Sequence, residues 1–174
     1  MPRIAKDLHD YVSHSSTFLP EQLALDDYVS HVLQRHEYGG STTSRYFGNA
    51  VGQELYAVSI YPDRTALIPG QQIPAALLRT FIQANRALLE DARNAVGTWY
   101  NREEDSTYLD ITTTLPDRAE AITLARQYNQ IAIYDLARQA EIATEGTGEE
   151  TDALPPLGQR LPALQRHRQR KHNG

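Results

Sequence analysis

The chain has 174 residues, a formal net charge of −5, no cysteine and 40% hydrophobic residues. This length fits one domain of ordinary size with short appendages. The absence of cysteine excludes disulfides, thiolate metal sites and a cysteine nucleophile. No apolar run reaches the roughly 18 residues of a transmembrane helix, and the N-terminal sequence MPRIAKDLHD lacks the apolar stretch of a signal peptide. We therefore expect a cytoplasmic protein that makes no membrane contact.

Charge is divided between an acidic body and a basic end. The last ten residues contain Arg166, Arg168, Arg170 and Lys171 and no acidic residue, which gives them a net charge of +4. Since the whole chain has 17 basic and 22 acidic residues, the other 164 residues carry 13 basic and 22 acidic ones, a net charge of −9. An acidic body argues against nucleic-acid binding by the folded part. The four basic side chains alone would give weak, salt-sensitive and sequence-independent phosphate contacts.

The segment 145–174 has the composition of a disordered tail. It is rich in Gly, Thr, Glu and Pro, has neighbouring prolines at 155 and 156, and contains no aromatic residue. Such a segment buries too little apolar surface to offset the entropy lost on ordering. We expect it to be disordered with a basic end, and its stretch LPALQRHRQR can form a transient helix on a partner.

Two stretches near the N-terminus nearly duplicate each other, LHDYVSH from Leu8 and LDDYVSH from Leu25. Within each, Leu, Tyr and Val lie at positions i, i+3 and i+4, which form one stripe of a helix. Pro20 suits the first turn of a helix, and the glycine pair at 39 and 40 suits its end. We predict two helices, at about 2–15 and 20–37, packed as a helical hairpin that makes up residues 1–40.

The same repeat places an aspartate four residues before a histidine twice, Asp10 before His14 and Asp27 before His31. Each pair can interact on one helix face. If the two faces met across the hairpin, they would offer two carboxylates and two imidazoles to a divalent metal. Nothing in the sequence requires them to meet, so we predict no metal site. The Tyr–Val stripes offer another use, as a surface for forming a homo-oligomer.

Residues 41–144 are predicted to form an α+β unit. Side-chain alternation and β-favouring residues predict strands at 41–47, 55–61, 65–68, 96–101, 107–115 and 131–134, with 139–142 extending the last after a turn. Pro74 opens one helix, whose apolar stripe is interrupted only by Asn85. Asp117 caps a second helix, with Glu120 three residues later. This order predicts a mostly antiparallel sheet with helices on one face.

Tyrosine-rich strands suggest a binding surface. In the strand TYLDITTTL, Tyr108 and Asp110 share the face opposite the apolar residues, as in a sheet that is covered on one side. Tyr and Trp are enriched in interaction hot spots because their rings are large and amphipathic. Our candidate binding residues are Tyr56, Tyr61, Trp99, Tyr108 and Asp110.

The central unit lacks the common catalytic motifs. It has no phosphate-binding glycine loop, no HExxH and no G-x-S-x-G, and all six histidines lie outside residues 41–144. A general acid–base site there would depend on carboxylates or tyrosines, with Asp110 as the first candidate because it lies mid-strand beside Tyr108. We predict no catalytic residue and no cofactor. A small carboxylate- and tyrosine-based enzyme remains the alternative.

Three segments carry a resemblance to known proteins: YAVSIYPD from Tyr56, VGTWYNREEDSTYLDI from Val96 and RAEAITLARQYNQIAIYDL from Arg118. Over about residues 56–142 they resemble small uncharacterised proteins of bacterial phages and mobile elements. These motifs are structural rather than catalytic, so no functional residue follows from them. The resemblance implies an accessory protein that binds another protein.

Our functional prediction is therefore a non-enzymatic module that binds a protein partner through the helical hairpin or the exposed sheet face. A weak nucleic-acid binder that acts through the basic tail is a further alternative.

Overall fold

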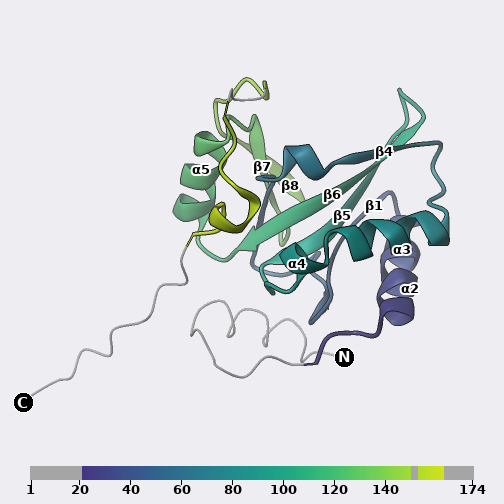
Figure 1. The fold of residues 1–174 in the computed structure, drawn as a ribbon. Helices are drawn as coiled ribbons and strands as arrows, with labels where there is room; N and C mark the ends of the chain where they lie inside the picture. The colour runs from purple at the N-terminus through teal and green to yellow at the C-terminus, as the bar shows by residue number, and fades with distance from the viewer. Residues whose placement is uncertain (1–20, 150–152, 163–174) are drawn as a thin grey trace, which may run out of the picture.

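The structure, a computed structural model, describes residues 21–149 and 153–162 of the chain. Within these residues it contains an eight-stranded antiparallel sheet with the strand order β2-β1-β5-β6-β3-β7-β8, in which β4 also pairs with β6. The helices pack on one side of this sheet (Figure 1). The prediction of an α+β fold with a mostly antiparallel sheet is confirmed.

The described elements follow the predicted order closely. The helices are α2 (Leu25–His36), α3 (Ala75–Ala84), α4 (Arg86–Leu89) and α5 (Arg118–Gln127), with 3-10 helices η1 (Pro62–Arg64) and η2 (Leu157–Gln159). The strands are β1 (Gly40–Ser44), β2 (Gly48–Asn49), β3 (Tyr56–Val58), β4 (Ala66–Pro69), β5 (Asn94–Asn101), β6 (Ser106–Leu115), β7 (Ala132–Asp135) and β8 (Ala140–Ala143).

A long hairpin of β5 and β6 forms the centre of the sheet. The two strands pair continuously from Asn94 opposite Thr113 to Asn101 opposite Ser106. Leu109 is completely buried on the helix side, as the alternation predicts, and α5 begins with the predicted cap, because the Asp117 carboxylate accepts from the Glu120 backbone N–H at 2.7 Å. The hairpin thus divides the sheet into a core face and an open face.

Two strands share the second edge of β6. β4 pairs with residues 106–109 and β3 pairs with residues 113–115. Between β3 and β4 the chain leaves the sheet and forms η1. The strand predicted at 55–61 is therefore shorter than expected, since β3 ends at Val58. Ile60 and Tyr61 are consecutive and both buried, which the alternation of a strand would not allow.

Polar contacts tie α2 to the sheet. The hydroxyl of buried Tyr28 donates to the carbonyl of Thr43 in β1 at 2.7 Å and accepts from the backbone N–H of Val96 in β5 at 3.2 Å. Buried His36 lies between the Thr98 hydroxyl at 2.8 Å and the carbonyl of Gln71 at 2.7 Å. Because a carbonyl only accepts, the Nε2 of His36 donates to it, and its Nδ1 is left to accept from Thr98 in the neutral ring.

The structure joins α2 to the α+β unit. Its apolar stripe belongs to the same hydrophobic cluster as β5, β6 and α5, so no domain boundary follows residue 40. Asp27 and His31 are both exposed on the outer side of α2, and no ion pair joins them. The first predicted helix, and with it the predicted hairpin and the Asp10–His14 pair, lies outside the described residues.

Asn85 divides the helix predicted to begin at Pro74. α3 ends at Ala84 and α4 begins at Arg86, with Asn85 between them at φ −106° and ψ 17°. The side chain of Asn85 is buried but satisfied: its amide donates to the carbonyl of Phe81 at 2.8 Å, and its carbonyl accepts from Arg64 at 2.7 Å. The polar interruption in the stripe is therefore a hydrogen-bonded break between two helices.

Residues 153–162, which we call the strap, differ from the expectation of a disordered tail. Leu154, Leu157 and Leu161 pack against the main hydrophobic cluster. Their spacing places an apolar side chain on the core every three or four residues, although the surrounding composition is polar. The average composition of segment 145–174 concealed this local pattern.

Arg160 fastens the strap to the core. Its buried guanidinium donates to both carboxylate oxygens of Asp63 in η1, at 2.5 and 2.8 Å, and to the carbonyl of Ile60 at 3.0 Å. It also lies 5.4 Å from the ring centre of Tyr61. Charge-assisted, bidentate pairing of this kind is among the stronger hydrogen bonds in proteins. The same contact holds the pKa of Asp63 below its usual value.

We predict that Arg160→Ala lowers the free energy of unfolding by about 2 kcal/mol, the loss expected for hydrogen bonds to a charged group. The matched control is Arg79→Ala, because Arg79 also pairs with an aspartate, Asp26, but both side chains are solvent-exposed. Such surface pairs contribute roughly 0–1 kcal/mol. Urea denaturation of both variants measures the difference, and equal losses would contradict the assigned role of Arg160.

Candidate binding surface on the open face of the sheet

Strand register brings three apolar side chains into one row across the open face. Tyr108 of β6 lies opposite Trp99 of β5 on one edge and opposite Leu67 of β4 on the other. Directly opposed residues of antiparallel strands share a face, with their Cβ atoms about 5 Å apart. Trp99 is 55% exposed and Leu67 is 59% exposed. The row is thus a solvent-facing apolar surface on three adjacent strands.

The two aromatic rings of the row stack on each other. The centroids of Trp99 and Tyr108 are 5.5 Å apart and their planes are inclined by 30°. This separation lies within the range in which aromatic pairs attract. The contact restrains the rotamers of both rings before a partner binds. Binding there therefore costs less side-chain entropy than binding to two independent aromatic side chains would.

Carboxylates lie on both sides of this aromatic pair along β6. Glu104, at the hairpin tip, accepts a 2.6 Å hydrogen bond from the Tyr108 hydroxyl. Asp110 lies two residues beyond Tyr108 on the same face and accepts from the hydroxyl of Thr65 at 2.5 Å. Among the residues that the structure describes, no ion pair involves either carboxylate. We call Leu67, Trp99, Glu104, Tyr108 and Asp110 the acidic–aromatic patch.

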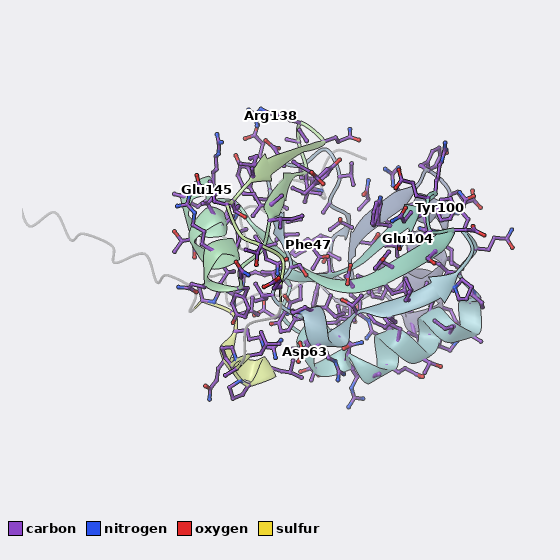
Figure 2. All side chains as sticks on the ribbon, turned by 90° about the horizontal axis from the view of Figure 1, so that it is seen from above. Phe47, Asp63, Tyr100, Glu104, Arg138 and Glu145 are labelled. Atoms are coloured by element: carbon purple, nitrogen blue, oxygen red, sulfur yellow. The ribbon has the colours of Figure 1, made fainter. Side chains whose placement is uncertain are left out.

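A second tyrosine–carboxylate pair stands beside the patch. The hydroxyl of Tyr100 donates to Asp105 at 2.8 Å, and Figure 2 shows Tyr100 and Glu104 at the same end of the sheet. Both tyrosines have a raised pKa, chiefly because the hydrogen bond to a carboxylate favours the neutral phenol. Each of these tyrosine hydroxyls thus donates to a carboxylate at the hairpin tip.

Asp110 has the most perturbed surroundings of the patch. Burial raises the pKa of its carboxyl, and the hydrogen bond from Thr65 opposes that rise. Gly97 lies opposite it on β5, where the Oγ1 of Thr112 occupies the space that a Cβ would need. Because Gly97 has no side chain, Thr112 and Asp110 of the neighbouring strand β6 have room to lie side by side on the open face.

The structure groups some of the predicted binding residues and separates others. Trp99, Tyr108 and Asp110 meet in the patch. Tyr61 is 1% exposed in the main core, under Arg160, and Tyr56 packs against that core from β3. Neither lies in the patch, because Tyr56 faces the helix side from β3 and Tyr61 is buried where the chain enters η1. The basic residues Arg166, Arg168, Arg170 and Lys171 lie outside the described residues.

Sequence reasoning missed two members of the patch, Leu67 and Glu104. Leu67 was placed correctly in a short strand, but the pairing of that strand with β6 depends on the turn at η1, which no local pattern encodes. Glu104 was read as part of a polar loop. Its contact with Tyr108 follows from the hairpin register, which the β5–β6 loop length alone could have suggested.

Comparison with protein families, curated proteins and solved structures finds no match to this chain. Among the described residues, no group of three or more His, Asp or Glu side chains is placed to hold a metal ion. No helix in the described part of the chain is long and apolar enough to cross a membrane. The patch is therefore the feature of the described residues from which a function can be inferred.

The two perturbed aspartates give opposite predictions for the pH dependence of stability. Asp63 has a lowered pKa, so its ionised form stabilises the fold above the ordinary aspartate value of 3.8, and this contribution is lost as pH falls. Asp110 has a raised pKa, so its ionisation near and above that value destabilises the fold. At neutral pH, Asp63→Asn should lower the free energy of unfolding and Asp110→Asn should raise it.

Denaturation of the two variants and the wild type at a series of pH values tests both signs. The difference for Asp63→Asn should shrink as pH falls below 3.8, because the wild-type carboxyl is protonated only there. The difference for Asp110→Asn should shrink at higher pH, as pH falls toward 3.8, because this carboxyl is protonated above its ordinary value. A loss of stability in Asp110→Asn at neutral pH would contradict the assignment of burial as the dominant influence on Asp110.

Proposed function

We propose that the protein is a non-enzymatic interaction module whose acidic–aromatic patch binds a partner polypeptide. The observation that carries this proposal is the exposed row of Leu67, Tyr108 and Trp99 on three neighbouring strands. Large apolar side chains gathered on one face are a recognised mark of interaction sites. Tryptophan and tyrosine also contribute disproportionately to binding energy when a partner covers them.

The charges around the row define the chemistry of the partner. Glu104 and Asp110 lie on either side of Tyr108 and form no ion pair within the described residues, so a basic side chain finds a counter-ion at either end of the row. An arginine can stack its guanidinium on the ring of Trp99 and reach a neighbouring carboxylate at the same time. The partner segment therefore combines apolar side chains with arginine or lysine.

This role is the one expected from the sequence, that of an accessory protein which binds another protein. Such a module acts in the cytoplasm, without a cofactor, by holding its partner. A basic partner segment also fits the acidic body of the chain, whose negative charge would speed the encounter with it.

We predict that Trp99→Ala weakens partner binding by roughly 30-fold, which corresponds to about 2 kcal/mol for a hot-spot residue. Affinity purification from the native host with wild-type and variant protein, followed by titration of the captured partner, measures the change. The side chain of Trp99 is more than half exposed, so the variant should keep its fold, which circular dichroism verifies.

Tyr134→Ala is the matched control, because Tyr134 is an exposed aromatic residue on β7, outside the patch. Its binding should equal that of the wild type. A partner that binds Trp99→Ala and wild type equally, or one that is lost with Tyr134→Ala instead, would refute the proposal that the patch is the binding surface.

A further inference from the structure

We propose that the chain's own basic segment, residues 163–174, docks on the acidic–aromatic patch and competes there with the partner. This inference adds a form of regulation to the proposed function and rests on the same patch. The occupant is the C-terminal segment of the same molecule, and it is identified by charge, by spacing and by reach.

Charge complementarity is the first argument. Residues 163–174 contain Arg166, Arg168, Arg170 and Lys171 and no acidic residue. The patch contributes the carboxylates of Glu104 and Asp110, and the hairpin tip beside it adds Glu103 and Asp105 against a single basic residue, Arg102. Neither patch carboxylate has an ion-pair partner among the described residues. The strongest cluster of positive charge in the sequence thus has a complement in a negative surface whose carboxylates form no ion pair within the described part of the chain.

Spacing is the second argument. The three arginines alternate with other residues, so an extended segment carries all three on one side, about 6.6 Å apart. Positions on one face of β6 repeat at the same interval, and there they present Tyr108 and Asp110, with Trp99 beside Tyr108. Successive guanidinium groups would therefore meet an aromatic face and a carboxylate in turn, both of which bind arginine well.

Reach is the third argument. The strap ends at Pro162, whose carbonyl accepts a 2.5 Å hydrogen bond from Arg93, the residue before β5. Trp99 lies six residues further along the chain, or about 20 Å of strand. The segment must also pass from the helix side of the sheet to its open face. Eight extended residues beyond Pro162, which span about 26 Å, reach Arg170 and allow for this longer path. Figure 1 shows the strap near one end of the long strands and the hairpin tip at the other.

Because the segment is tethered to the body, weak contacts are enough for it to occupy the patch. The few exposed ion pairs and stacking contacts available to this segment would each contribute little on their own. Because the strap anchors the segment to the body, however, its effective concentration near the patch is of the order of millimolar, as for other short flexible linkers. A contact of this kind is occupied in the free protein and can still be displaced by a partner with more apolar surface.

The test uses the full chain and the emission of Trp99, the single tryptophan of the sequence. The test variant carries Arg166→Gln, Arg168→Gln and Arg170→Gln. At low salt its emission should differ from that of the wild type, because the segment no longer covers the ring. Added salt should bring the wild-type emission to that of the variant, since it screens exposed charge pairs. The control variant Arg86→Gln, Arg118→Gln and Arg126→Gln, which changes three exposed arginines elsewhere, should match the wild type.

Partner titration gives the second readout. The variant with three glutamines in the segment should bind the partner about tenfold more tightly, because the internal competitor is weakened. Identical emission of wild type and this variant at low salt would overturn the inference, even if Trp99→Ala abolished partner binding. An emission difference that grows with protein concentration would also overturn it, since the contact would then join two molecules. If Trp99→Ala bound the partner as tightly as the wild type, by contrast, only the proposed function would be refuted.

Discussion

The register of the β5–β6 hairpin is the constraint on which most of this molecule depends. Eight consecutive residue pairs fix which side chains of the two strands face the helices and which face solvent. A shift by one residue would turn every side chain of one strand to the other face. Leu109 would then leave the core, and Tyr108 would lose its place beside Trp99. The core and the acidic–aromatic patch therefore lie on the two faces of one strand pairing. Burial of the apolar face fixes the register, and the register positions the side chains of the exposed face.

The helix side uses polar contacts to position its elements as well as apolar packing. Tyr28 joins α2 to β1 and β5 through one hydroxyl, and Asn85 turns a break between two helices into a hydrogen-bonded joint with Arg64. Arg160 likewise fixes the strap to η1 by donating to the carboxylate of Asp63. Each of these polar groups is buried with a partner, so it fixes a geometry without leaving a donor or acceptor unsatisfied.

Local patterns in the sequence predicted the elements well and their tertiary arrangement less well. The hairpin of β5 and β6, the cap at Asp117 and the faces of β6 all follow from alternation and capping, which act over a few residues. The burial of Tyr61 and the pairing of β4 with β6 depend on the turn at η1, where residues distant in sequence meet. The strap was missed because its three leucines and Arg160 are diluted by polar neighbours. For the patch, Trp99, Tyr108 and Asp110 could be named from the sequence, whereas Leu67 and Glu104 required the register.

The detour between β3 and β4 gives the fold a point of mechanical coupling. Asp63 and Thr65 are two residues apart in this detour. Asp63 holds the strap through Arg160, and Thr65 donates to the carboxylate of Asp110 on the opposite face of the sheet. A displacement of η1 that follows the strap therefore moves the hydroxyl that positions Asp110. One short turn, inserted where β6 exchanges one neighbouring strand for another, thus connects the C-terminal strap to the open face through two side-chain contacts.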